Sequence, residues 1–126
     1  MNQPPTRRGI ALLAHGSRDA AWRGPLEAIA ARMRELDPGA IVACAYLEQN
    51  APDLSTAASA LLTAGAASIT VWPMFLGAGR HARLDMPRLM EQLRQQHPNV
   101  PMRLAPAIGT HPGVLEAMAR AALGGD

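Results

Sequence analysis

Short apolar runs alternate with longer amphipathic segments along the chain, and this alternation restricts the possible folds more than any other feature. Four apolar runs have the length of buried strands: residues 9–14, 40–47, 68–76 and 100–109. Four segments have apolar residues at helical spacing: residues 22–36, 52–65, 83–97 and 111–123. Strands that alternate with helices form a parallel sheet covered on both faces. The sequence therefore predicts an α/β fold, a small doubly wound parallel sheet of about four βα units.

The length of 126 residues is enough for one domain with a hydrophobic core, but not for two. We expect a flexible leader over residues 1–8, followed by a single domain over 9–126. The leader has no long apolar region of the kind found in signal peptides. No apolar stretch approaches the roughly 20 residues that span a membrane. These observations predict a cytoplasmic protein.

The charged residues limit the partners that the chain can bind. Its formal net charge is only +2, and every basic side chain is arginine, which donates two parallel hydrogen bonds to carboxylate or phosphate. The arginines are not gathered in one stripe, which argues against nucleic-acid binding.

The single Cys44 excludes an intramolecular disulfide and a cysteine-based zinc cluster. Its position inside an apolar run predicts a buried thiol.

Polar residues follow each predicted strand at its carboxyl end, the edge at which open parallel sheets bind their ligands. In chain order these residues are His15, Glu48, Arg80 with His81, and Thr110 with His111. Three of the four histidines and one isolated carboxylate therefore converge on one rim. The fourth histidine, His97, lies near the end of the third predicted helix.

Each rim residue also has a purely structural interpretation. A histidine after a strand is commonly a hydrogen-bonded loop residue, Glu48 alone resembles a solvated loop acid, and His111 before a proline is typical of a helix cap. Two imidazoles and a carboxylate on one rim, however, suit a borderline divalent cation. The residues by themselves support a metal or acid–base site and a structural rim about equally.

Several competing motifs are incomplete. The segment G-A-G-R-H-A at 77–82 has two glycines of the dinucleotide fingerprint, but Ala82 stands at the third glycine position. Ser17 is close to His15 but lacks the G-x-S-x-G elbow of hydrolases. Ala14 stands where a histidine phosphatase has its arginine. Dinucleotide-binding, hydrolase and phosphotransfer functions are therefore disfavoured.

Four motifs, in order, resemble the short, single-domain sirohydrochlorin chelatases, the CbiX-type cobaltochelatases. They are H-G-S-R-D (15–19), L-E-Q-N-A-P-D-L (47–54), W-P-M-F-L-G-A-G-R-H-A-R-L-D-M-P (72–87) and I-G-T-H-P-G-V (108–114). The third motif is the most specific. The resemblance implies a class II chelatase fold and the insertion of a divalent metal ion into a tetrapyrrole with eight carboxylates. Cobalt, with iron and nickel as further possibilities, would be a substrate for cobalamin or sirohaem biosynthesis, and no organic cofactor is needed.

The resemblance also assigns roles to residues. The two metal-site histidines of the family fall on His15 and His81, and its acid falls on Glu48, so these three are the predicted catalytic and metal-binding residues. Imidazoles can hold the ion weakly and accept the pyrrole protons. The residues expected to bind the carboxylates of the tetrapyrrole are Ser17, Arg18, Gly79, Arg80 and Arg83.

One domain of this size covers only one face of a cleft, so the resemblance predicts a homodimer. A noncatalytic carrier of metal or tetrapyrrole on the same fold is the alternative function. The two differ in turnover, because a carrier binds its ligand one to one and does not consume it.

Overall fold

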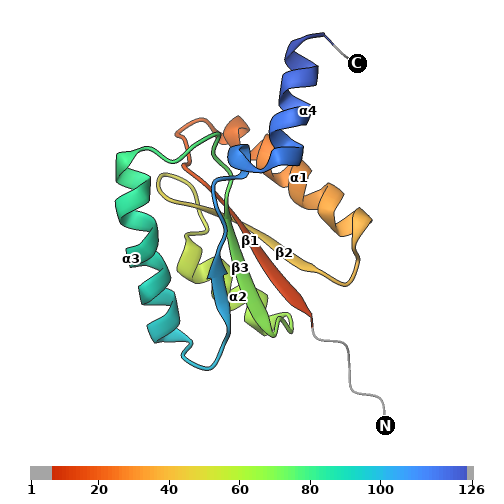
Figure 1. Cartoon of the computed structure of the whole chain (residues 1–126). Helices are drawn as coiled ribbons and strands as arrows, with labels where there is room; N and C mark the ends of the chain where they lie inside the picture. The colour runs from red at the N-terminus through yellow and green to blue at the C-terminus, as the bar shows by residue number, and fades with distance from the viewer. Residues whose placement is uncertain (1–6, 125–126) are drawn as a thin grey trace.

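The computed structural model describes residues 7–124, apart from the side chain of His81, and strands alternate with helices as predicted (Figure 1). The strands are β1 (Arg8–Ala14), β2 (Ile41–Tyr46), β3 (Ser68–Pro73) and β4 (Met102–Leu104). The helices are α1 (Arg23–Leu36), α2 (Leu54–Thr63), α3 (Arg80–Gln96) and α4 (Pro112–Ala122), with short 3-10 turns η1 (Ala20–Trp22) and η2 (Ile108–Thr110). Residues 1–6 of the predicted leader lie outside the described residues, and Arg8 already belongs to β1. None of the helices in the described part of the chain is long and apolar enough to cross a membrane.

The sheet is parallel throughout, with the strand order β2-β1-β3-β4. The central strand β1 pairs with both neighbours, so that Leu12 lies opposite Cys44 on one side and Trp72 on the other. The predicted doubly wound α/β fold is confirmed. The order of the strands reverses between β1 and β3, and open sheets bind ligands at such a switch point.

Alternate residues of the strands build two separate cores, one on each face of the sheet. Ala11, Leu13 and Val71 belong to the larger core, which α2 and α3 cover. Leu12 and Ala14 belong to the smaller core, which α1 covers with Leu26 and Ala30. Two helices therefore cover the larger core, and one helix covers the smaller core.

Helix α4 does not cover the sheet. None of its eleven residues is buried, and it extends away from the body of the molecule (Figure 1). The chain leaves the sheet early because β4 has only three residues, and the turn η2 then redirects it. Gly109 N donates to the carbonyl of Phe75 at 2.9 Å and holds this turn against the end of β3. Helices cover both faces of the sheet as predicted, but on the face of the smaller core this covering comes from α1 without α4.

The boundaries of the elements differ from the sequence prediction mainly at the rim. Helix α3 begins three residues earlier than predicted, so Arg80 and His81 lie in its first turn rather than in a loop. Strands β3 and β4 end earlier than the apolar runs at 68–76 and 100–109 suggest. Apolar residues beyond their ends, such as Phe75 and Ala107, form a small third cluster at the rim. Apolar content was therefore not enough to mark the strand ends.

Candidate functional site

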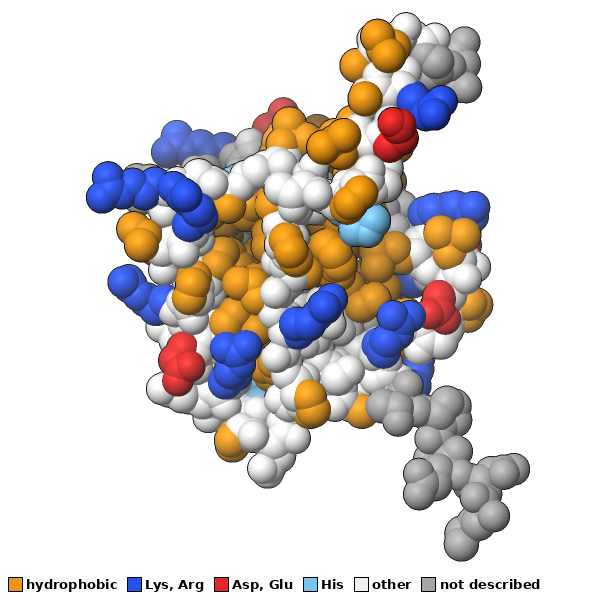
Figure 2. Space-filling model, viewed as in Figure 1, with side chains coloured by type: hydrophobic (Ala, Val, Ile, Leu, Met, Phe, Trp, Pro, Cys, Tyr) orange, Lys and Arg blue, Asp and Glu red, His pale blue; other side chains and the backbone are white. Residues whose placement is uncertain are grey.

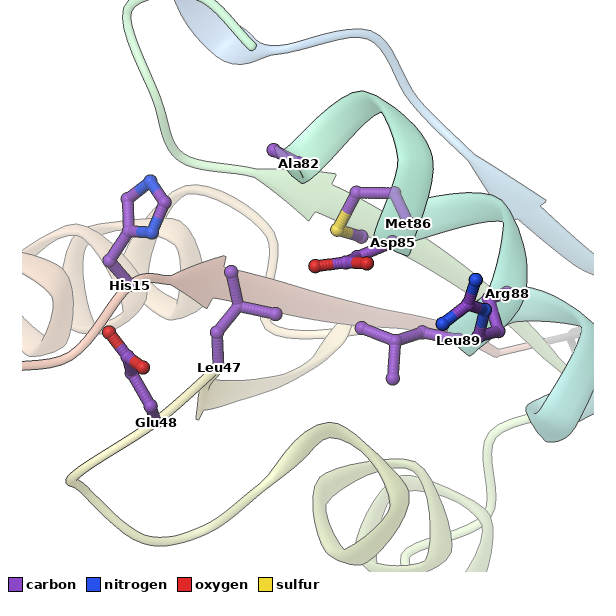
Figure 3. A pocket seen from close by; sticks show the side chains of 8 residues that line it. All are labelled: His15, Leu47, Glu48, Ala82, Asp85, Met86, Arg88 and Leu89. Atoms are coloured by element: carbon purple, nitrogen blue, oxygen red, sulfur yellow. The ribbon is translucent and has the colours of Figure 1, made fainter. Parts of the chain in front are cut away.

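The segments after β1 and β2 stay hydrogen-bonded to each other beyond the ends of the strands. Leu47 N donates to the carbonyl of Ala14 at 2.9 Å, and Glu48 N donates to the carbonyl of His15 at 3.0 Å. This continuation of the ladder brings the side chains of His15 and Glu48 to neighbouring positions on the rim (Figure 3). His15, which follows β1, and Glu48, which follows β2, therefore lie next to each other on the rim.

Gly16 allows the two segments to approach so closely. Its φ is +97°, in the region that favours glycine, and a Cβ there would collide with the backbone carbonyl of Glu48. The next residue completes the contact, because Ser17 N donates to Asn50 Oδ1 at 2.6 Å. The hydroxyl of Ser17 accepts from Asp19 N at 3.1 Å, so it orders its own loop.

The imidazole of His15 stacks on the ring of Phe75, with the ring centroids 4.3 Å apart and an angle of 23° between the planes. Phe75 is the only phenylalanine of the chain and is buried at the end of β3. His15 itself is exposed. A ring held by one face keeps its edge, with both nitrogens, available to a ligand.

A cavity of about 580 Å³ opens beside His15. Its lining residues come from the segments after β1 and β2 and from α3: His15, Leu47, Glu48, Ala82, Asp85, Met86, Arg88 and Leu89. Figure 3 shows the carboxylate of Asp85 directed toward the same space as the imidazole. The volume of the cavity lies within the range of about 300–1,000 Å³ found for small-molecule sites. The cavity thus combines one imidazole, two carboxylates and one guanidinium with an apolar floor.

Several predicted substrate-binding residues lie outside this cavity. Arg18 and Arg80 are exposed on the rim, and Gly79 is the N-cap of α3. Arg83 lines a smaller, largely apolar cavity of about 240 Å³ between α3 and the segment after β4. His81 has its backbone in the first turn of α3, next to Ala82, and its side chain lies outside the described residues.

Sequence reasoning assigned no role to Asp85 and Arg88. Ala82, Asp85 and Leu89 lie three to four residues apart and therefore share one face of α3, which is the face toward the cavity. This helical spacing was present in the sequence, as was the position of Asp85 four residues after His81. The spacing alone could not assign them a role, because it does not show which face of α3 turns toward the rim.

The remaining candidate residues have structural roles. His111 caps α4, with its Nδ1 accepting from Gly113 N at 3.0 Å, and His97 stands at the C-terminal end of α3. Cys44 is half-buried, and burial raises the pKa of its thiol, which keeps the thiol protonated. Within the described side chains, no three histidine, cysteine, aspartate or glutamate residues are grouped closely enough to hold a metal ion. A metal site built on His15 and Glu48 would therefore need a further donor.

The fold and the rim cavity define an open, parallel α/β domain whose site lies at the carboxyl ends of its strands, at the switch point of the sheet. Comparison with known families gives the narrower assignment. The family model of CbiX matches residues 9–123. The chain belongs to the CbiX family, which confirms the resemblance in its four motifs.

Individual relatives agree with this assignment. A sirohydrochlorin cobaltochelatase from Saccharolobus solfataricus is 37% identical over 82 residues, which are 65% of this chain and 62% of that protein. A crystal structure of a CbiX protein from Marinobacter aquaeolei is 38% identical, with a TM-score of 0.79 over 93% of this chain and 95% of the other. The cobalt complex of SirB from Bacillus subtilis subspecies spizizenii shares the fold, at 22% identity and a TM-score of 0.78. That match covers 94% of this chain but only 50% of the SirB chain.

Proposed function

We propose that this chain is a sirohydrochlorin metallochelatase, a lyase that inserts a divalent metal ion into the tetrapyrrole. The observation that carries the proposal is the meeting of His15 and Glu48 at the mouth of a cavity that Asp85 also faces. The names of the relatives support cobalt or iron as the metal, and nickel is a further possible substrate. The product would serve cobalamin or sirohaem biosynthesis.

The chemistry requires donors that hold the metal ion only for a short time. Insertion forms four bonds from the metal ion to pyrrole nitrogens, while two N–H protons leave and the ion loses its earlier ligands. His15 and Glu48 bind the incoming ion, and His81 is the proposed third donor. As the ion passes to the macrocycle, the freed imidazole takes one proton and a carboxylate takes the other. The metal is a substrate, and no organic cofactor is involved.

The carboxylates of the tetrapyrrole are bound by arginines on and around the cavity. Arg88 lines the cavity itself, Arg18 and Arg80 are exposed on the rim, and Arg83 lines the smaller cavity on the other side of α3. A planar guanidinium binds a carboxylate through two parallel hydrogen bonds. Backbone N–H groups at the positive end of α3, after Gly79, and the O–H of Ser17 add further donors.

A single copy covers one side of a flat macrocycle. We therefore place the substrate between two copies of the chain, in a homodimer that acts in the cytoplasm. The rim arginines of both copies then share the ring of carboxylates around the macrocycle.

The test compares two histidine variants in an anaerobic assay of cobalt insertion into sirohydrochlorin, followed by the loss of the metal-free absorption spectrum. His15→Ala should lower the insertion rate by at least about 100-fold, the lower range for general acid–base catalysis. His97→Ala, at the far end of α3, is the matched control and should retain the wild-type rate. A one-to-one spectral shift without turnover in the wild-type protein would identify a carrier instead of an enzyme. Equal rates in the two variants would remove His15 from the site.

A further inference from the structure

The backbone just after Glu48 adopts a conformation that is unfavourable for its sequence. Gln49 has a φ of +66°, and it is the only residue other than glycine with a positive φ in the part of the chain that the structure describes. Asn50 N donates to the carbonyl of Glu48 at 2.8 Å, across this residue. A hydrogen bond from residue i+2 to residue i over a positive φ is typical of a γ-turn of the rare and strained kind. The side chain of Gln49 is exposed, so contacts of the neighbouring residues must stabilise the turn.

Asn50 supplies such a contact through its side chain. Its Oδ1 accepts from Ser17 N at 2.6 Å, across 33 positions of the sequence. Because the donor is a backbone N–H, the oxygen of the amide and not its nitrogen faces Ser17. Asn50 is half-buried, so water competes only in part for this bond. Asn50 therefore ties the segment after β2 to the segment after β1.

These bonds hold Glu48 at both of its backbone polar groups. Its N–H donates to the carbonyl of His15 at 3.0 Å, and its own carbonyl accepts from Asn50 N. Asn50 is in turn bound to Ser17, two residues after His15, which closes a ring of hydrogen bonds around Gly16. Figure 3 shows the side chain of Glu48 extending toward His15. Loss of the Asn50 amide opens the ring next to the strained turn and allows Glu48 to move.

We propose that Asn50 is a positioning residue, which holds Glu48 beside His15 by keeping the strained turn at Gln49 in place. The imidazole and carboxylate ligands of a metal such as zinc lie only about 2.0–2.2 Å from the ion, so a small displacement of Glu48 removes a ligand. A pair of ligands that is held in place beforehand also binds at a lower entropic cost. The effect on metal binding rests on the proposed function, whereas the positioning of Glu48 can be measured without any metal ion.

The first experiment measures amide hydrogen exchange by NMR in the absence of metal and tetrapyrrole. In Asn50→Ala, the amide of Glu48 should exchange about 5-fold faster or more, because the bond that it donates opens more often. Asn50→Asp keeps an oxygen acceptor for Ser17 N and should retain the wild-type exchange rate. The amide of Ile69, which donates to Pro101 O at 3.0 Å near the start of β3, reports on general stability. An unchanged rate at Glu48 in Asn50→Ala, or the same acceleration at Ile69, would overturn the proposal.

A double-mutant comparison tests the role of the strained turn. Gln49→Gly permits a positive φ without the steric penalty of a Cβ. In this background Asn50→Ala should accelerate the exchange of the Glu48 amide by a smaller factor than in the wild-type background, because less strain has to be offset. Equal factors in the two backgrounds would show that Asn50 does not act through the turn and would refute this mechanism of positioning.

Cobalt binding without tetrapyrrole connects the positioning to the proposed function. Basic side chains are spread over the face shown in Figure 2, and the chain has a formal net charge of +2, which opposes nonspecific binding of cations. In a calorimetric titration with Co²⁺, Asn50→Ala should raise the dissociation constant by at least about 10-fold, the lower range for the loss of a residue that orients a metal ligand. Asn50→Asp should bind Co²⁺ at least as tightly as the wild type, since it keeps the acceptor.

The control for the titration is Asn99→Ala, which removes an exposed amide in the turn between α3 and β4 and should keep the wild-type dissociation constant. A wild-type constant for Asn50→Ala, together with weaker binding by Glu48→Ala, would overturn the positioning role of Asn50. Equal constants for the wild type and Glu48→Ala would count against the proposed chelatase site instead. In that case the exchange rates at Glu48 still decide whether Asn50 holds this residue in place.

Discussion

Gly16 offers the sharpest test of how the fold positions the site. A Cβ at residue 16 would lie 3.0 Å from the carbonyl carbon of Glu48 and 3.1 Å from Asn50 Oδ1, and closer still to the Glu48 oxygen. Gly16→Ala therefore places a methyl group where the backbone of the second segment already lies. The φ of +97° is in addition unfavourable for any L-residue with a Cβ.

The energetic cost of Gly16→Ala follows from these contacts. A left-handed conformation costs an L-residue about 1–2 kcal/mol. Separating the two segments also weakens the hydrogen bonds Glu48 N to His15 O and Ser17 N to Asn50 Oδ1, each worth about 0.5–1.5 kcal/mol. The free energy of unfolding should fall by about 2–4 kcal/mol. The insertion rate should fall as well, because Glu48 moves away from His15.

The assay is urea unfolding followed by circular dichroism, with Gly77→Ala as the control. A Cβ at residue 77 meets nothing within 4 Å, so that variant should unfold at the wild-type midpoint. With a slope near 2 kcal/mol/M, Gly16→Ala should lower the urea midpoint by about 1–2 M. Equal midpoints for the two variants would refute the close approach of the segments after β1 and β2.

Three further predictions each concern the substitution of one side chain. Asp53→Ala removes the carboxylate that caps α2 by accepting from Thr56 N at 2.8 Å, and should cost about 1 kcal/mol in urea unfolding at neutral pH. This hydrogen bond lowers the pKa of Asp53 below its ordinary 3.8, so the cap stabilises the fold above that pH, and the difference between wild type and variant should shrink as the pH falls through the lowered pKa. Arg88→Ala should raise KM for the tetrapyrrole several-fold in the cobalt-insertion assay, with a smaller change in kcat, and an unchanged KM would place the carboxylates elsewhere. Phe75→Leu should clearly lower the insertion rate, because it removes the ring that holds the imidazole of His15 in place, and should shift the urea midpoint only slightly. An unchanged insertion rate would show that the stack does not matter.

The fold was predictable from the sequence because its signals are local. Apolar runs of strand length and helical spacing repeat four times, and parallel sheets with crossover helices are the usual result. The ends of β3 and β4 were not predictable from these signals. Phe75 continues the apolar run past Pro73, but it packs at the rim instead of pairing with a neighbouring strand.

The site was predictable in part. His15 and Glu48 could be placed on one rim because each directly follows a parallel strand, and this rule depends only on topology. Asp85 and Arg88 were missed because their assignment depends on the rotation of α3, which an early start at Arg80 determines. The position of α4 was also not predictable, since its amphipathic pattern does not show which surface, if any, the helix covers.

In the proposed chelatase, the stack of His15 on Phe75 bears on the time that a metal ion would stay bound. Histidine ligands in permanent metal sites usually donate their second ring N–H to a carboxylate or carbonyl, which raises the basicity of the coordinating nitrogen and strengthens the bond. Here an apolar ring face orients the imidazole and contributes no such acceptor. In the proposed chelatase, a metal ion on this imidazole would therefore lack the stronger bond that such an acceptor provides. Short residence of the ion on this nitrogen is what repeated transfer requires, and an acceptor engineered next to the ring would turn the same site toward storage.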